Sequence, residues 1–193
     1  MDFIGEYQIS PEICDALVEY FERPDTFKFS DTILVQSHTD STDAFLCGDT
    51  RMTYLDEFAK CMHSYIDTWP NCKILLNDWG IHEDIVIRKY APGGGSKTLH
   101  CERPDSKGKL YKRVLAFETH LEDGGETVFL HQNHSIKPVK GTTVIWPVDW
   151  THARKVTSSK FVVCGWISFD EQLYVGLSRV KSDSVTAPVS SGS

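Results

Sequence analysis

The chain has 193 residues, a length that corresponds to one domain with a sizeable core. Its hydrophobic fraction of 40% and charged fraction of 24% are those of an ordinary soluble globular protein, which excludes disorder for most of the chain. The net charge of -7 and the lack of a Lys/Arg-rich stripe argue against nucleic acid as a partner. No apolar run approaches the about 20 residues that a membrane helix needs, so we expect no membrane partner.

The cysteines and the N-terminal sequence bear on the cellular compartment of the protein. The six cysteines are scattered without a C-x-x-C pair, and the start MDFIGEYQIS contains neither the basic region nor the apolar segment of a secretory signal. We therefore expect free thiols in a reducing, cytoplasmic setting. A disulfide framework is the alternative because the number of cysteines is even, but they are too dilute for a small disulfide-held scaffold.

Two helices are predicted in the first part of the chain. Ser10 followed by Pro11 is a helix-start signal, and apolar residues then recur at helical spacing until Pro24, which predicts a helix over 11–23. The same spacing predicts a second helix over about 49–69. In both helices the apolar stripe is best interpreted as core packing.

From residue 84 onward, short β-rich runs separated by Gly, Pro, Asn and Asp replace the helical period. Strands preceded by helices indicate a mainly β sandwich or barrel with flanking helices. We expect one domain over 1–181, with helical support from 1–80 and a β core from 81–170, followed by a flexible tail over 182–193. The expected strands are 84–90, 98–102, 112–121, 126–130, 135–139, 142–147 and 160–169.

A metal-binding pattern, H-x-[DE], occurs four times in the sequence. Iron(II) that must also bind a bidentate 2-oxoacid and oxygen leaves room for two imidazoles and one carboxylate from the protein. Residues i and i+2 of a strand point the same way, so this pattern can provide two of the three ligands. The four candidates are His38 to Asp40, His82 to Asp84, His100 to Glu102 and His120 to Glu122.

The surrounding sequence favours His100 and Glu102. Tyr90 closes a predicted strand ten residues before His100, and the glycines between them can turn the chain back beside that strand. Fifty residues beyond Glu102, His152 follows the strand TTVIWP and a short turn, and it provides the third candidate ligand.

The other histidines are interpreted as non-ligands. No tyrosine stands ten residues before His82, and His120 ends a strand that leads into the turn DGG. His38 lies in a polar loop that could line a substrate entrance. His131 and His134 lie in the polar connection HQNHS, where surface histidines are expected.

Lys160 opens the β-forming run KFVVCGWISF, eight residues after His152. Strand alternation places Lys160 on one face with Val162, Cys164 and Trp166. A lysine on an inner face is expensive to bury unless an anion neutralises it, and the far carboxylate of 2-oxoglutarate is such an anion. A strand-edge lysine in solvent is the alternative interpretation.

The region 85–169 resembles the iron(II)- and 2-oxoglutarate-dependent dioxygenases of the prolyl 4-hydroxylase group, including small bacterial and phage-type members. The resemblance rests on IVIRKYAPGGGSKTLHCE, RVLAFETHLEDGGETVFL, IKPVKGTTVIWP and WTHARKVTSSKFVVCGW. It implies a double-stranded β-helix, or jelly roll, flanked by helices. Most members of the group have aspartate at the position of Glu102, and the additional methylene of glutamate changes where the carboxylate lies.

The resemblance also implies roles for individual residues. His100, Glu102 and His152 match the iron ligands, Lys160 matches the residue that binds the far carboxylate of 2-oxoglutarate, and Tyr90, Thr127 and Trp166 match positions that line the co-substrate pocket. The co-substrates implied are 2-oxoglutarate and molecular oxygen, with ascorbate as a reductant.

The activity implied is hydroxylation of an unactivated C–H bond, with a prolyl residue in a peptide or protein as the leading substrate. The polar loop 103–112 is a candidate substrate lid. Two alternatives remain open from the sequence. One is an oxidative demethylase of nucleic acid, which would need a basic groove and an aromatic stacking platform. The other is a non-catalytic jelly-roll binding module.

Overall fold

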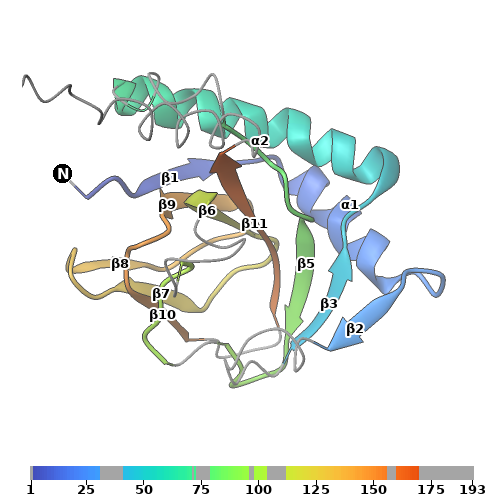
Figure 1. Ribbon diagram of the computed structural model, residues 1–193. Helices are drawn as coiled ribbons and strands as arrows, with labels where there is room; N and C mark the ends of the chain where they lie inside the picture. The colour runs from blue at the N-terminus through green and yellow to red at the C-terminus, as the bar shows by residue number, and fades with distance from the viewer. Residues whose placement is uncertain are drawn as a thin grey trace, which may run out of the picture.

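The computed structural model describes residues 2–30, 41–70, 72, 79–95, 98–103, 112–155 and 160–169. Within these ranges, two helices lie on one side of two antiparallel sheets (Figure 1). The expected mainly β fold with flanking helices, a jelly roll, is confirmed. The predicted tail over 182–193 lies outside the described residues.

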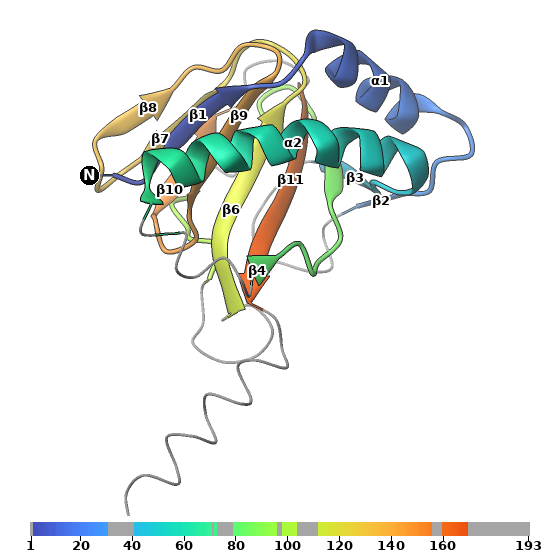
Figure 2. The same cartoon turned by 90° about the horizontal axis from the view of Figure 1, so that it is seen from above.

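Both predicted helices are present, with ends shifted by one residue. Helix α1 spans Pro11–Glu22, with proline at its start, and helix α2 spans Gly48–Thr68. α1 buries Cys14, Leu17 and Phe21, which follow one another at three- and four-residue steps on one face. α2 lies across the strands of the larger sheet (Figure 2). The helices therefore cover one face of that sheet with the stripes that the sequence predicts.

The larger sheet has eight strands in the order β1-β9-β6-β11-β5-β3-β2, and β4 pairs with β11. Its strands are β1 (Gly5–Gln8), β2 (Lys28–Ser30), β3 (Ser41–Phe45), β4 (Trp79–Gly80), β5 (Val86–Tyr90), β6 (Arg113–His120), β9 (Thr142–Pro147) and β11 (Lys160–Phe169). All of its pairings are antiparallel.

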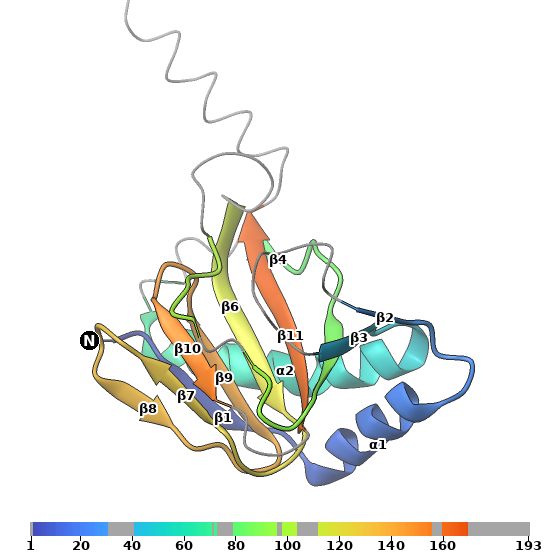
Figure 3. The same ribbon diagram turned by 90° about the horizontal axis from the view of Figure 1, so that it is seen from below.

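A smaller sheet, in the order β10-β7-β8, lies on the other side of the larger one (Figure 3). It consists of β7 (Glu126–Phe129), β8 (His134–Ile136) and β10 (His152–Lys155). Phe129 and Ile136 of the smaller sheet pack with Ala116, Val144 and Trp146 of the larger sheet in a second apolar cluster. The molecule thus has one core under the helices and another between the sheets.

The two faces of β11 contact these two cores, as strand alternation predicts. Phe161 and Val163 belong to the core under the helices. Val162 and Cys164 lie on the opposite face with Tyr90, and Trp166 packs against the cluster between the sheets. Lys160 is therefore on the inter-sheet face.

Several elements differ from the sequence-based expectation. Residues 98–102 form no strand, because only an isolated bridge pairs His100 with His152. Residues 1–80 supply β1, β2, β3 and β4 to the larger sheet as well as the two helices. β10 was also not predicted. These strands are short or polar, and their pairing with distant partners, rather than their own propensity, defines them.

The remaining expectations concern membranes and cysteines. No helix within the described ranges is long and apolar enough to span a membrane. All six cysteines are free thiols, and three of them, Cys14, Cys61 and Cys164, are buried.

Candidate active site

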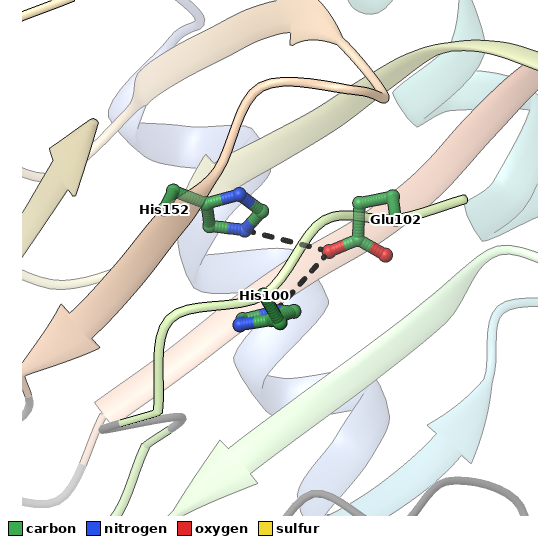
Figure 4. A group of neighbouring side chains, drawn as sticks. All are labelled: His100, Glu102 and His152. Atoms are coloured by element: carbon green, nitrogen blue, oxygen red, sulfur yellow. Dashed lines mark ion pairs between the residues drawn. The ribbon is translucent and has the colours of Figure 1, made fainter. Parts of the chain in front are cut away.

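Three side chains converge beside the start of β10 in the smaller sheet. His152 is the first residue of β10, and His100 and Glu102 come from the segment next to it (Figure 4). Two backbone hydrogen bonds join the segments, from His100 N to His152 O (3.0 Å) and from His152 N to His100 O (2.9 Å). Glu102 N donates to the carbonyl of Val148 (2.9 Å). These attachments bring the three side chains together although no strand forms at 98–102.

The candidate ligand atoms face a common point. Glu102 Oε1 lies 3.6 Å from His100 Nε2 and 3.5 Å from His152 Nε2, and the ligand atoms all lie within 4.8 Å of one another. The Nδ1 atom of each imidazole lies near a backbone carbonyl, that of Thr98 for His100 (3.0 Å) and that of Trp150 for His152 (3.1 Å). Because Nδ1 can donate to this carbonyl, each ring is oriented with Nε2 toward the centre.

The electrostatics of the three groups favour a cation between them. Burial alone would raise the pKa of Glu102, but hydrogen bonds and charges of the two histidines hold it well below its usual range. Burial would lower the pKa of His100, but the hydrogen bond and charge of Glu102 outweigh this and raise it. His152 Nε2 is fully buried, and the partner that faces it among the described residues is Glu102 Oε1, at 3.5 Å.

Two imidazoles and one carboxylate fit iron(II) that must keep positions open for other ligands. Among the described residues this group is the candidate for holding a metal ion. His82 and Asp84 are exposed, as is His131, while His134 forms ion pairs with Asp2 and Glu6. The pair His38 to Asp40 lies outside the described residues.

Lys160 is buried deeper between the sheets, with 2% of its surface exposed, so the interpretation as a solvent-exposed lysine is wrong. It lies opposite Tyr90 in the β11–β5 pairing, and its Nζ donates to the carbonyl of Gly124. Burial lowers the pKa of Lys160 to about 8; Glu118 opposes this shift and Arg154 adds to it. The ammonium group therefore lies where an anion would stabilise it.

Arg154 occupies the same space, and sequence reasoning missed it. The residue follows His152 by two positions in β10, so both side chains point to the same side of the strand. Its guanidinium donates to the Tyr90 hydroxyl and to Glu118, while its Nε has no hydrogen-bond partner within the described ranges. Thr127, opposite Arg154 in β7, has a buried hydroxyl that makes no hydrogen bond to any described residue.

Two further residues of β6 complete this group. Glu118 Oε1 and both ring nitrogens of His120 are buried and have no hydrogen-bond partner among the residues that the structure describes. Burial, with the charges of Lys160 and Arg154, lowers the pKa of His120 well below its usual range. We call this set the inter-sheet polar cluster; its members are Tyr90, Glu118, His120, Thr127, Arg154 and Lys160. So many unpaired buried polar atoms are unusual in a folded protein and indicate a place for a polar ligand.

Trp166 lies on the predicted face but contacts the metal-ligand group. Its Nε1 donates to Glu102 Oε2 (3.0 Å). The guanidinium carbon of Arg113 lies 3.5 Å from the centre of the indole ring. Arg113 Nη1 also donates to the carbonyl of Glu102 (3.2 Å). Of the lid predicted over 103–112, residues 104–111 lie outside the described residues.

Comparison with known proteins identifies the class of this site. Residues 85–168 match the family model of the 2OG-Fe(II) oxygenase superfamily. This part of the chain is a 2-oxoglutarate- and iron(II)-dependent oxygenase domain, and the protein is a 2-oxoglutarate-dependent dioxygenase. Iron(II), 2-oxoglutarate and molecular oxygen are accordingly its cofactor and co-substrates. A search of curated proteins found no significant sequence match.

Solved prolyl hydroxylases share the fold. The viral collagen prolyl hydroxylase of Paramecium bursaria Chlorella virus-1 is 19% identical with a TM-score of 0.63, over 88% of this chain and 97% of that one. A Pseudomonas putida prolyl-4-hydroxylase is 15% identical with a TM-score of 0.65, over 88% and 94%. A Trichoplax adhaerens prolyl hydroxylase, solved with a peptide of hypoxia inducible factor, is 15% identical with a TM-score of 0.60, over 89% and 86%.

Proposed function

We propose that this dioxygenase hydroxylates a prolyl residue in a peptide or protein, with His100, Glu102 and His152 as the iron ligands. The observation that carries the proposal is the convergence of these three side chains, with two Nε2 atoms and one carboxylate oxygen facing a common point. The choice of a prolyl substrate is supported by the structural relatives, which are prolyl hydroxylases from a virus, a bacterium and an animal.

In this proposal the protein binds and orients its substrates, and iron with 2-oxoglutarate and oxygen supplies the oxidising chemistry. Lys160 holds the far carboxylate of 2-oxoglutarate from the inner end of the site. Tyr90 and Thr127 line the same space. Tyr90 lies opposite Lys160 in the β11–β5 pairing, and the buried Thr127 hydroxyl, opposite Arg154, has no hydrogen-bond partner in the described part of the chain. Trp166 contributes through its hydrogen bond to Glu102.

The charges between the sheets support a dicarboxylate as the occupant. Arg154 is paired with Glu118, and Arg88 is paired with Asp43. Lys160 donates its hydrogen bond to the neutral carbonyl of Gly124, so its ammonium group adds a positive charge that these two pairs do not balance. A carboxylate at this place would balance that charge. The other carboxylate of 2-oxoglutarate, next to its ketone, would reach the metal.

The proposal is tested by supplying the purified protein with Fe(II), 2-oxoglutarate, oxygen and proline-containing peptides. We expect the peptides to stimulate succinate formation and to gain the mass of one oxygen atom at proline. Peptides with alanine in place of proline, and the His152→Ala variant, are the controls and should give neither signal. Stimulation by alkylated oligonucleotides instead would identify a nucleic-acid demethylase, and a lack of 2-oxoglutarate turnover with any substrate would indicate a binding module.

A further inference from the structure

The two carboxylate oxygens of Glu102 face different partners. Oε1 is turned toward the Nε2 atoms of both histidines, whereas Oε2 accepts the hydrogen bond of the Trp166 indole. An indole nitrogen can only donate, and here Oε2 is the acceptor that it contacts. The carboxylate is thus oriented with one oxygen toward the metal position and the other held away from it.

Arg113 fixes the indole from behind. Its guanidinium stacks on the Trp166 ring and is itself held by Glu83, through hydrogen bonds of 2.8 and 2.5 Å. It donates in addition to the backbone carbonyl of Glu102 (3.2 Å), and Ser168 Oγ lies 3.4 Å from Glu83. Arg113 Nη1 also lies 4.0 Å from Glu102 Oε2, as a weak ion pair. Arg113 therefore constrains Glu102 at its backbone and acts on its side chain both directly and through Trp166.

An irregularity in the β6–β11 pairing aims Arg113 at this position. Trp166 lies opposite Ala116, but the register shifts between Ile167 and Ser168, so that Ser168 lies opposite Arg113. In a regular pairing Arg113 would share the face of Leu115, which belongs to the core under the helices. The extra residue moves Arg113 to the Trp166 face, which is the kind of re-aiming that bulges produce beside active sites.

We propose that Trp166, held by Arg113, is a positioning residue that makes Glu102 bind the metal through a single oxygen. The inference rests on the proposed iron site. Three protein ligands on an octahedral ion leave room for the two donor atoms of 2-oxoglutarate and for oxygen. If Glu102 used both oxygens, the position for oxygen would be lost once 2-oxoglutarate is bound. Glutamate has one more rotatable bond than aspartate, so this restraint matters more here.

Trp166→Phe is the informative variant, because it keeps an aromatic ring under Arg113 and removes the N–H donor together with part of the ring, a loss of size that a second Trp→Phe variant can control for. Trp79→Phe is the matched control. The Trp79 indole nitrogen is buried without a hydrogen-bond partner among the described residues, and its ring packs at the end of β11 under the helices. Both substitutions remove an indole N–H from the same sheet, but only one of them faces Glu102.

The first measurement uses Co(II) in place of iron, followed by visible absorption, which responds to the number of bound ligand atoms. We expect Trp166→Phe to bind Co(II) with an altered spectrum before 2-oxoglutarate is added, and Trp79→Phe to match the wild type. In turnover, kcat of Trp166→Phe should fall by roughly 10- to 100-fold. The KM for 2-oxoglutarate should stay near the wild-type value, since two metal positions remain for it.

The outcomes separate this inference from the proposed function. A Trp166→Phe spectrum identical to that of the wild type would overturn the positioning role and leave the iron site intact. A raised KM for 2-oxoglutarate at unchanged kcat would also overturn it, because Trp166 would then line the co-substrate site. Failure of the wild type to bind Co(II) would overturn both proposals. If Trp166→Phe does not fold, Arg113→Gln should shift the spectrum in the same direction.

Discussion

The metal-ligand group and the inter-sheet polar cluster are neighbours built in opposite ways. His100 and Glu102 come from an irregular segment and keep 32% and 19% of their side chains exposed, and backbone hydrogen bonds to β10 and Val148 locate them. The cluster consists of buried side chains on regular strands, and sheet register locates them. A short sequence motif can therefore reveal the first region as a group, whereas the contacts within the second, and its member Arg154, become visible only when the strands are paired.

Removing a metal ligand should have the largest effect, because no other side chain of the metal-ligand group can replace the lost imidazole. His152→Ala is expected to abolish Co(II) binding and 2-oxoglutarate turnover. His131→Ala, which alters an exposed histidine, should leave both unchanged. Isothermal titration of the metal-free protein with Co(II) measures the binding. Wild-type affinity in His152→Ala would remove His152 from the ligand set.

Breaking the buried pair in the second region should reduce stability rather than metal binding. Arg154→Met leaves the carboxylate of Glu118 buried without its partner, which typically costs about 3–5 kcal/mol. Urea unfolding of the metal-free protein measures this loss. Asp15→Asn, which removes an exposed partner of Lys140, should cost about 1 kcal/mol or less. Equal losses in the two variants would mean that the buried pair is not a structural element of the cluster.

Removing the lysine of the cluster should distinguish the two regions kinetically. Lys160→Ala is expected to raise the KM for 2-oxoglutarate by roughly 10- to 100-fold, the range for a lost hydrogen bond to a charged group. Co(II) affinity should stay near wild type, because Lys160 does not belong to the metal-ligand group. Lys140→Ala, at a lysine paired on the surface, is the control. Unchanged 2-oxoglutarate kinetics in Lys160→Ala would refute the assignment of the anchor.

The sequence predicts most of the fold because hydrophobic periodicity reports burial. It identifies both helices and the strands whose inner faces are apolar, such as β9 and β11. It misses β3 and β10, since their buried faces carry polar residues: Asp43 in β3 pairs with Arg88, and Arg154 in β10 pairs with Glu118. Apolar patterning does not predict a strand whose buried face lines a polar site, because function there requires polar residues where the core would otherwise have apolar ones.

The candidate site, like the fold, was predictable in part from the sequence. The spacing of His100, Glu102 and His152 identified the residues that converge, and alternation placed Lys160 on the inner face. Alternation gives the face of a side chain but not its neighbours across the molecule. The contact of Trp166 with Glu102 depends on where the segment 98–103 crosses the sheet, which no local pattern encodes.

The smallest expected effect is a pH dependence that belongs to the cluster alone. Lys160 is charged below its pKa of about 8, and burial is the main cause of this low value. The charged groups that act on it are Glu118, Arg154, Glu122 and Asp123. As the pH rises through 8 the ammonium loses its proton, so the KM for 2-oxoglutarate should rise, by about tenfold at pH 9. Below pH 8 this group should cause no change.

Lys160→Arg, whose guanidinium stays charged, should abolish the rise, because arginine does not titrate in this range. If the KM for 2-oxoglutarate still rises above pH 8 in Lys160→Arg, a group other than Lys160 titrates, and the pH dependence does not belong to the inter-sheet polar cluster.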